Sequence, residues 1–309
     1  MANTNDLLNR MNSKYSCMSK AHKRLATYIT DNYDKAVFLT ASKMGMVVGV
    51  SESTVVRFAM SLGYKGYPEF QKALEELVRN KLNSVQRMKV AYGRISQSKV
   101  METVLQSDAE KLKSTLEQID HQAFEVAVDT ILEARNIYIV GIRSCAPLAS
   151  FLAFYLNLMF DNVRLLQTNS SSELFEQMLR INEEDVIIGI SFPRYSMRTL
   201  KVLEFANNRN ARVITLTDSV HSPMNLYSSC NLIANSDMVS IVDSLVAPLS
   251  VINALVVALC MRKQEEVATT LTMLEDIWDE YQVYEKDEID KIDDSIQIHY
   301  AKLEEIENE

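Results

Sequence analysis

The feature that most constrains the fold is a series of short apolar runs in the second half of the chain, separated by segments with the period of a helix. Strands that are apolar on both sides are typical of a parallel sheet covered on both faces. The series therefore predicts an α/β domain with a five-stranded parallel sheet covered by helices. The expected strands are residues 136–141, 163–168, 185–192, 212–217 and 231–234.

The N-terminal region carries the pattern of a helix-turn-helix between residues 40 and 62. Gly45 lets two helices approach closely, and Gly49 can adopt the positive φ of a tight turn. Ser51 is placed to cap the second helix, because its side-chain oxygen can accept a backbone N–H of the first turn. The pattern predicts a helix with one buried face, whose polar face can enter the major groove of DNA. The residues of the buried stripe are Val55, Phe58, Ala59 and Leu62.

The polar face of this helix provides the expected DNA contacts. Arg57 lies opposite the apolar stripe and is expected to contact a base or a phosphate, as are Ser53 and Thr54. Two interpretations of Glu52 stay open, since it can accept a hydrogen bond from cytosine or only stabilise the helix dipole. The flanking lysines are expected to meet phosphates. The full set of expected DNA contacts is Lys43, Ser51, Glu52, Ser53, Thr54, Arg57 and Lys65.

The charge of the chain is unevenly distributed. Residues 1–99 carry a net charge of +9, residues 100–264 carry −5, and residues 265–309 carry −13. A basic end joined to an acidic body indicates that only the first part meets a polyanion. We expect a helix within residues 1–35, and Lys20, Lys23 and Arg24 give it a basic face. This face is either solvated or contacts phosphates.

Two stretches of the N-terminal region resemble a known family. Residues 51–58 read Ser-Glu-Ser-Thr-Val-Val-Arg-Phe, and residues 62–67 read Leu-Gly-Tyr-Lys-Gly-Tyr. Both closely resemble the N-terminal domain of RpiR-type bacterial transcriptional regulators. That family joins such a domain to a C-terminal sugar isomerase (SIS) domain, which agrees with the predicted parallel sheet. The resemblance covers roughly residues 5–265.

The candidate ligand site follows from the predicted sheet, because ligands of open parallel sheets bind beyond the carboxyl ends of the strands. Two loops there place hydroxyl and N–H groups at helix N-termini, and each adds an arginine that can hold phosphate or carboxylate in a fork. Structural ion pairing is the alternative for these arginines. Thr217 follows the fourth strand and either closes the pocket or caps a turn. The expected ligand-binding residues are Arg143, Ser144, Cys145, Ser191, Arg194, Ser196 and Thr217.

Both loops depart from the usual SIS pattern, which resembles G-x-G-x-S in the first loop and S-x-S-G-x-T in the second. Arg143 stands at the second glycine of the first loop, and Cys145 stands at its serine. Pro193, Arg194 and Ser196 stand at the Ser, Gly and Thr of the second loop. Because the loops lose hydroxyl donors and gain arginines, we expect a small anionic carbohydrate derivative, phosphorylated or acidic, rather than a standard hexose phosphate.

The sequence argues against several other classes of protein. The four cysteines and four histidines are scattered without a metal-binding spacing, so we expect neither a metal nor another cofactor. Free cysteines and a polar N-terminus indicate a cytoplasmic protein. Residues 244–261 carry no charge but contain Pro248, Ser250 and Asn253, so a buried helix is expected there rather than a membrane span.

The leading hypothesis is a bacterial transcriptional regulator that binds a double-stranded DNA operator and responds to an anionic sugar metabolite. Its SIS domain is expected to form a homodimer or tetramer, which pairs two recognition helices. One alternative is a sugar-phosphate isomerase with an accessory N-terminal interaction domain, for which Glu173 and His221 are the candidate bases, although we expect no catalytic residue. Another is a DNA-binding structural protein whose SIS domain only dimerises. The expected parts are a helix-turn-helix domain (1–80), a helical linker (81–120), the SIS domain (121–264) and an acidic helical extension (265–309).

Overall fold

The computed structural model describes residues 6–37, 39–71, 73–74, 85, 97–168, 170–236 and 242–284. The chain divides into two compact units, residues 1–259 and 260–309, at a point inside its penultimate described helix. Of the expected linker (81–120), residues 81–84 and 86–96 lie outside the described residues. The same is true of residues 285–309 of the expected acidic extension.

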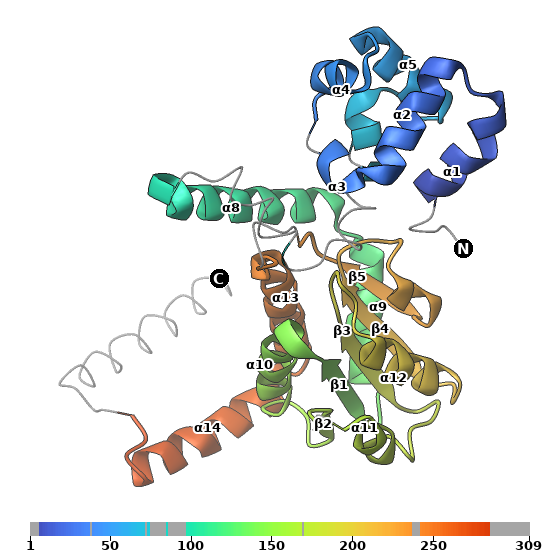
Figure 1. The fold of residues 1–309 in the computed structure, drawn as a ribbon. Helices are drawn as coiled ribbons and strands as arrows, with labels where there is room; N and C mark the ends of the chain where they lie inside the picture. The colour runs from blue at the N-terminus through green and yellow to red at the C-terminus, as the bar shows by residue number, and fades with distance from the viewer. Residues whose placement is uncertain are drawn as a thin grey trace, which may run out of the picture. The chain divides into compact units, whose positions relative to one another are not determined.

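The secondary-structure elements described in the N-terminal region are all helices (Figure 1). Ser19, Thr40 and Ser51 each begin a helix by accepting a backbone N–H of its first turn. The chain is also helical at residues 67–71 and 73–74. The elements are α1 (Asp6–Lys14), η1 (Tyr15–Cys17), α2 (Lys20–Asp31), α3 (Tyr33–Ala36), α4 (Ala41–Val48) and α5 (Glu52–Ser61).

The turn between α4 and α5 confirms the expected roles of both glycines. Gly49 has φ 73° and ends α4 in the left-handed conformation. Val50 N–H donates to the carbonyl of Gly45 at 2.8 Å, and a Cβ at Gly45 would lie only 2.7 Å from the Val50 oxygen. The two helices can therefore meet this closely only with glycine at position 45.

The core of this region gathers around the buried side of α5. Phe58 is fully buried and makes edge-to-face contacts with His22 and Phe70, whose ring centroids lie 5.5 and 5.8 Å away. Met44 of α4 and Leu25 of α2 belong to the same cluster. Burial of this apolar stripe leaves the opposite side of α5 exposed.

The second half of the chain forms the predicted five-stranded parallel sheet, in the order β2-β1-β3-β4-β5. The edge strand β2 is shorter than expected, because its pairing with β1 stops at Ile139 and Leu165. The strands are β1 (Ile137–Gly141), β2 (Val163–Leu165), β3 (Val186–Ile190), β4 (Arg212–Thr217) and β5 (Cys230–Ile233).

Helices cover both faces of this sheet, as predicted. α10 and α13 lie on one side, and α11 and α12 lie on the other (Figure 1). Tyr138, Val140 and Ile187 point to the side of α11 and α12 and share a buried cluster with their residues. The helical elements are α9 (His121–Leu132), η3 (Arg143–Cys145), α10 (Ala146–Leu156), α11 (Ser171–Gln177), α12 (Met197–Asn207), η4 (Pro223–Leu226) and α13 (Val246–Arg262).

A buried carboxylate fastens the amino ends of β1 and β3. Asp185 is fully buried and accepts hydrogen bonds from Arg135 Nε at 3.0 Å and Nη2 at 2.8 Å, from Asn136 Nδ2 at 2.8 Å, and from the Asn182 N–H at 3.0 Å. Burial raises the pKa of the Asp185 carboxyl, but these hydrogen bonds and the Arg135 charge outweigh it, so the net shift is downward. The carboxylate therefore stays ionised and holds both strand ends.

Two further helices complete the described chain: α8 (Val100–Gln118), which follows η2 (Gln97–Lys99), and α14 (Gln264–Glu280). α8 is joined to the loop after β5 by polar contacts. The Asn235 N–H donates to Thr115 Oγ1 at 2.9 Å, Asn235 Nδ2 donates to Ser114 Oγ at 2.9 Å, and Ser244 Oγ donates to Asp108 at 2.6 Å.

The charge-free run 244–261 forms α13, one side of which is buried in the α/β domain through Pro248, Ile252 and Leu255. Among the described residues, no single helix is both long and apolar enough to cross a membrane. Only α13 and α14 taken together pass that test of length and composition, and the chain bends sharply between them.

Candidate functional site

The amino end of α5 is held by a small hydroxyl network. Ser51 Oγ accepts the Thr54 N–H at 3.3 Å and lies 2.8 Å from Thr54 Oγ1 and 3.0 Å from Ser53 Oγ. Arg57 Nε donates back to the Ser53 carbonyl at 3.3 Å. The structure thus brings Ser51, Ser53, Thr54 and Arg57 together on one side of the helix, although the Ser51 hydroxyl is already used as the cap.

Most of the expected DNA contacts are accessible. Thr54 is half-buried, whereas the other expected residues are exposed. Glu52 occupies the first turn of α5, where its charge favours the positive end of the helix dipole. Lys43 belongs to the first turn of α4, and Lys65 follows α5 in the loop before the next helix. These two lysines therefore flank the recognition helix and do not belong to it.

Two residues of α2 take part in this surface in a way the sequence did not indicate. Arg24 Nη2 donates to the Gly49 carbonyl at 3.0 Å, so it braces the turn of the motif. Burial against Phe58 lowers the pKa of His22, and the positive charge of Arg57 lowers it further. His22 thus packs as an apolar ring beside the recognition helix. Neither role has a spacing signal, because α2 and α5 are brought together only by the fold.

A crevice is expected where the connections of an open sheet part in opposite directions. Here the chain leaves β1 towards β2 on one side and leaves β3 towards β4 on the other, so that point lies between β1 and β3. Gly141 pairs with Ile190 at the carboxyl ends of these strands. The two loops that were singled out from the sequence therefore start side by side.

The first loop turns tightly into α10. A Cβ on Gly141 would lie 2.6 Å from the Cys145 carbonyl oxygen and 2.9 Å from the Ala149 side chain, so this position requires glycine. Arg143 is exposed and has φ 61°, a left-handed conformation that is unfavourable for a residue with a side chain. Ser144 is exposed, whereas Cys145 is buried, and burial raises the pKa of its thiol.

The second loop leads from β3 into α12. Ser191 is buried, and its Oγ accepts the Ser196 N–H at 3.3 Å, which closes the loop on itself. Arg194 is exposed and Ser196 is half-buried at the start of α12. The structure therefore leaves the side chains of Arg143 and Arg194 exposed on neighbouring loops.

The loop after β4 contributes support rather than a free hydroxyl. Thr217 is fully buried, and its Oγ1 donates to Ser222 Oγ at 3.0 Å and to Asp218 Oδ1 at 3.4 Å. Asp218 also accepts the Tyr195 hydroxyl at 2.7 Å, which ties this loop to the second one. The Thr217 hydroxyl therefore faces inward in this structure and is bonded within its own loop.

The two candidate bases are both exposed. The Glu173 carboxylate accepts a hydrogen bond from the Thr168 hydroxyl. The backbone N–H of Glu173 donates to Ser170 Oγ at the start of α11. His221 lies in the turn after β4, where its backbone N–H donates to Ser219 Oγ at 3.1 Å. Within the described ranges, no group of three or more His, Cys, Asp or Glu is arranged to hold a metal ion.

Residues 5–81 match the helix-turn-helix domain of the rpiR family, and residues 130–258 match the SIS domain. The chain belongs to the RpiR family. It is similar to an uncharacterized HTH-type transcriptional regulator of Haemophilus influenzae, with 25% identity over 276 residues that cover 87% of this chain and 94% of that protein. As an RpiR-family transcriptional regulator it has its DNA-binding domain at the N-terminal end.

Two solved structures share the fold of this RpiR-family chain. The sugar isomerase domain of an RpiR transcription factor from Sphaerobacter thermophilus has a TM-score of 0.55 and 29% identity, covering 58% of this chain and 99% of that one. The NanR protein of Vibrio vulnificus, solved in complex with ManNAc-6P, has a TM-score of 0.53 and 21% identity, covering 88% of this chain and 97% of that one.

Proposed function

We propose that this regulator binds an operator through α5 and binds a phosphorylated or otherwise anionic carbohydrate derivative in the crevice between β1 and β3. The observation that carries the ligand is the pair of exposed arginines on adjacent loops, Arg143 and Arg194. A guanidinium group binds phosphate or carboxylate through two parallel hydrogen bonds. Vibrio vulnificus NanR, which shares the fold, is complexed with a sugar phosphate, which supports this ligand class.

Arg143 supports this assignment more strongly than exposure alone. Its left-handed backbone costs roughly 1 kcal/mol or more, which glycine would avoid. The two helix N-termini that the loops feed, those of α10 and α12, add a favourable field for an anion. A site with two arginines and few free hydroxyls favours a ligand of high negative charge, such as an acid sugar or a phosphosugar.

We assign the reading of DNA to the exposed side of α5. Ser53 and Arg57 lie one helical turn apart on that side, within reach of base edges when the helix enters the major groove. Lys43 and Lys65, which flank the helix, fit phosphate contacts. One such helix makes few base contacts, so specificity calls for two of them on a two-fold operator.

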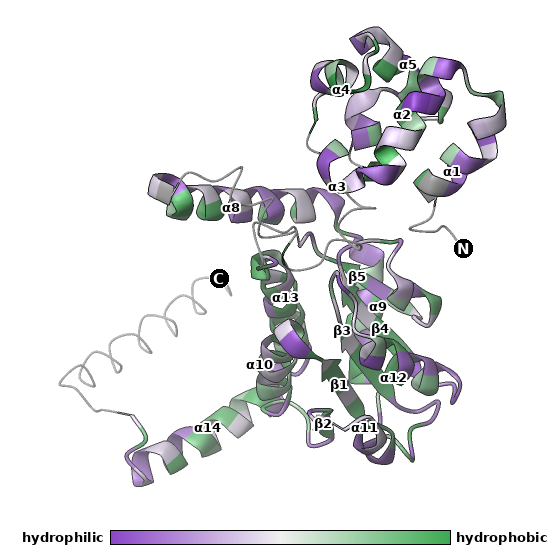
Figure 2. Ribbon diagram, viewed as in Figure 1, coloured by the Kyte–Doolittle hydropathy of each residue, from purple (hydrophilic) through white to green (hydrophobic). Residues whose placement is uncertain are grey.

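A homodimer is supported by the unusual polarity of α8. This helix turns Lys111 and Thr115 inward, although both are polar. Its exposed residues include an apolar stripe at the spacing of a helix-helix contact, which is Met101, Leu105, Leu112 and Leu116. Figure 2 colours many residues of α8, α10 and α13 as apolar. A second copy that covers the α8 stripe would remove this apolar surface from water.

The ligand assignment is tested by thermal shift with a panel of phosphosugars and acid sugars. We expect at least one of them to raise the melting temperature of the wild type, and Arg143→Ala or Arg194→Ala to abolish that shift. Lys113→Ala, which removes an exposed charge from α8, serves as the control and keeps the shift. If no anionic sugar stabilises the wild type, or if both arginine variants respond as it does, the crevice is not the ligand site.

The DNA assignment is tested by selecting duplexes from random DNA with the full-length protein and measuring their affinity by gel shift. Arg57→Ala should lose about 1–3 kcal/mol of binding free energy, or about 5- to 150-fold in affinity. Lys113→Ala is again the control. Unchanged affinity of the Arg57→Ala protein would remove this residue from the interface.

The alternative function, a sugar-phosphate isomerase, requires a base beside the bound substrate. Glu173 is exposed in the first turn of α11, where it is already hydrogen-bonded to Thr168, and His221 is exposed in the turn after β4. We infer that binding rather than turnover is the role of the crevice. NMR of the protein incubated with the same phosphosugars checks this, since an aldose–ketose conversion would favour the isomerase.

A further inference from the structure

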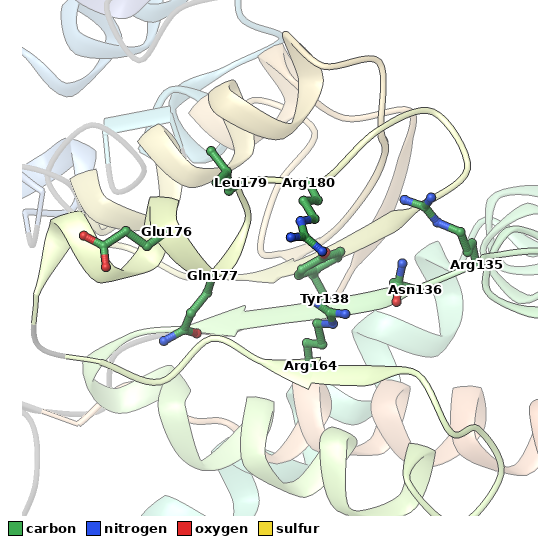
Figure 3. A pocket seen from close by; sticks show the side chains of 8 residues that line it. All are labelled: Arg135, Asn136, Tyr138, Arg164, Glu176, Gln177, Leu179 and Arg180. Atoms are coloured by element: carbon green, nitrogen blue, oxygen red, sulfur yellow. The ribbon is translucent and has the colours of Figure 1, made fainter.

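A second cavity lies at the other end of β1 from the crevice. It has a volume of about 600 Å³, which suits a small molecule, and it opens on the side of the sheet covered by α11 (Figure 3). Its lining residues are Arg135, Asn136, Tyr138, Arg164, Glu176, Gln177, Leu179 and Arg180. Because β1 has five residues, the cavity and the crevice are about 15 Å apart.

Three arginines line this cavity, but only one of them is neutralised. Arg135 is held by Asp185 at 2.8 Å and by Glu184 at 3.1 Å. Arg164 lies with its guanidinium carbon 5.5 Å from the centre of the Tyr138 ring. Neither Arg164 nor Arg180 forms an ion pair with any residue that the structure describes. The cavity therefore holds two uncompensated positive charges.

Tyr138 is the central residue of the lining. Its ring is 99% buried, since its relative exposure is 1%, and in Figure 3 the side chains of Arg164 and Arg180 both reach towards it. Its hydroxyl has no hydrogen-bond partner within the described part of the chain. Burial raises the pKa of Tyr138, more than the positive charge of Arg164 lowers it, so the phenol remains a proton donor at neutral pH. Because no described residue accepts a hydrogen bond from it, this hydroxyl is available to donate to a ligand oxygen.

The acidic member of the lining does not offset these charges. In Figure 3 the Glu176 carboxylate points away from the Tyr138 ring, on the far side from the guanidinium groups. Asn136 Nδ2 is used by Asp185, which leaves its amide oxygen as an acceptor beside the cavity. The donors that remain, two guanidinium groups and one phenol, match the oxygens of a single dianion better than those of a monoanionic carboxylate.

We propose that this cavity is a second anion site, distinct from the crevice, that takes a phosphate dianion or the phosphoryl group of a small phosphate ester through Arg164, Arg180 and the Tyr138 hydroxyl. Arg135 stays bound to Asp185 and forms the back of the site. The amide oxygen of Asn136 and the amide group of Gln177 are available to hydroxyl groups on the body of an ester. A free phosphate and an ester share this chemistry and differ in whether they use these amides.

The test measures phosphate binding to the full-length protein by equilibrium dialysis with radiolabelled inorganic phosphate. It uses Arg143→Ala/Arg194→Ala as the parent, so that the crevice is already removed and its failure as a site does not affect the result. We expect this parent to bind one phosphate per chain. Arg164→Gln/Arg180→Gln added to the parent should weaken binding at least tenfold.

Tyr138→Phe separates the hydroxyl from the packing of the ring. It should weaken phosphate binding severalfold and leave the melting temperature unchanged or higher, because the hydroxyl has no described partner in the unliganded chain. Lys113→Gln/Lys201→Gln removes two exposed positive charges elsewhere and should leave binding unchanged.

The proposal is overturned if the parent binds no phosphate, or if the two arginine substitutions leave its affinity unchanged. It is equally overturned if the lysine control loses as much affinity as the arginine variant, since binding would then reflect net charge alone. Repeating the dialysis with competing glycerol phosphate separates the two sources. If glycerol phosphate competes more strongly than unlabelled phosphate, and Gln177→Ala removes that advantage, the natural ligand is an ester. Equal competition identifies phosphate itself.

Discussion

At the scale of single residues, Arg143 shows how a fold can keep an unfavourable backbone. The first loop of the crevice turns so tightly that Gly141 tolerates no Cβ, and two positions later the chain must adopt a positive φ. Glycine would be the low-energy choice there, and the resembling SIS pattern has glycine. The presence of arginine at position 143 is therefore not explained by stability. Binding of the proposed anionic ligand explains it.

Replacement of Arg143 by glycine separates these two effects. Arg143→Gly should leave the melting temperature equal to or above that of the wild type, because the left-handed strain of roughly 1 kcal/mol is relieved while glycine adds backbone entropy to the unfolded chain. The same variant should bind its anionic ligand at least tenfold more weakly. Calorimetry and titration check both. Ligand affinity that survives the change would assign Arg143 no part in binding.

Asp185 joins the ends of two strands through its negative charge. Its pKa is lowered in the folded chain, so its contribution to stability is present above the unfolded pKa of about 3.8 and is lost as the pH falls through the folded value. Asp185→Asn should cost about 2–4 kcal/mol at neutral pH, since Arg135 and two further N–H donors, Asn136 Nδ2 and the Asn182 N–H, lose their carboxylate. Urea unfolding at pH 7 measures this. The difference between wild type and variant should shrink below pH 4, and a constant difference would contradict the assignment.

At the scale of elements, the sequence predicted most of what the structure shows. Parallel strands covered on both faces read as apolar runs, so the strands and their alternation with helices could be located. The end of β2 could not, because an edge strand stops where its single neighbour stops pairing. Once the strands were located, the positions of the loops at the carboxyl ends of β1 and β3 could be predicted as well.

Side-chain directions within the site were beyond the sequence. Nothing in the order of residues indicates that Thr217 turns inward to Ser222 and Asp218. The cavity at Tyr138 is assembled from the start of β1, the middle of β2 and the end of α11, which are distant in sequence and share no motif spacing. The predicted DNA and ligand contacts remain predictions until they are tested.

The α4–α5 pair gives a prediction about helix packing. Gly45→Ala should destabilise the N-terminal domain by about 1–3 kcal/mol, because the new Cβ would lie 2.7 Å from the Val50 oxygen and push the helices apart. Gly66→Ala is the matched control, since its Cβ would meet only Pro68 at 3.7 Å. Thermal unfolding of both variants checks this. Equal stability of the two would show that the helices can separate without penalty.

At the scale of the whole molecule, the predicted parts at 1–80, 81–120, 121–264 and 265–309 remain predictions. The compact units divide at residue 259. α14 carries the first acidic residues of the extension and exposes apolar residues such as Met273 and Ile277. The proposed function needs two recognition helices on one operator, so it depends on how copies of the chain associate. We propose the apolar stripe of α8 as the surface for that association.

Association through α8 predicts a change of mass in solution. Leu105→Glu should convert the proposed dimer or tetramer to a smaller species, because Leu105 is 61% exposed and its replacement puts a charge in the apolar stripe. Leu226→Glu, at a residue 67% exposed in η4, is the control. Sedimentation velocity measures both. If the two variants sediment alike, α8 is not the interface.

Asn235 and Ser244 donate hydrogen bonds to α8, which tie this helix to the loop after β5, at the carboxyl edge of the sheet where we propose the crevice. If the crevice ligand acts on DNA binding through this joint, thermodynamic reciprocity requires the converse. Operator DNA must then change the affinity for the ligand by the same factor as the ligand changes the affinity for DNA. Titrating the metabolite with and without operator therefore measures the regulatory strength of the molecule, before any second conformation has been seen.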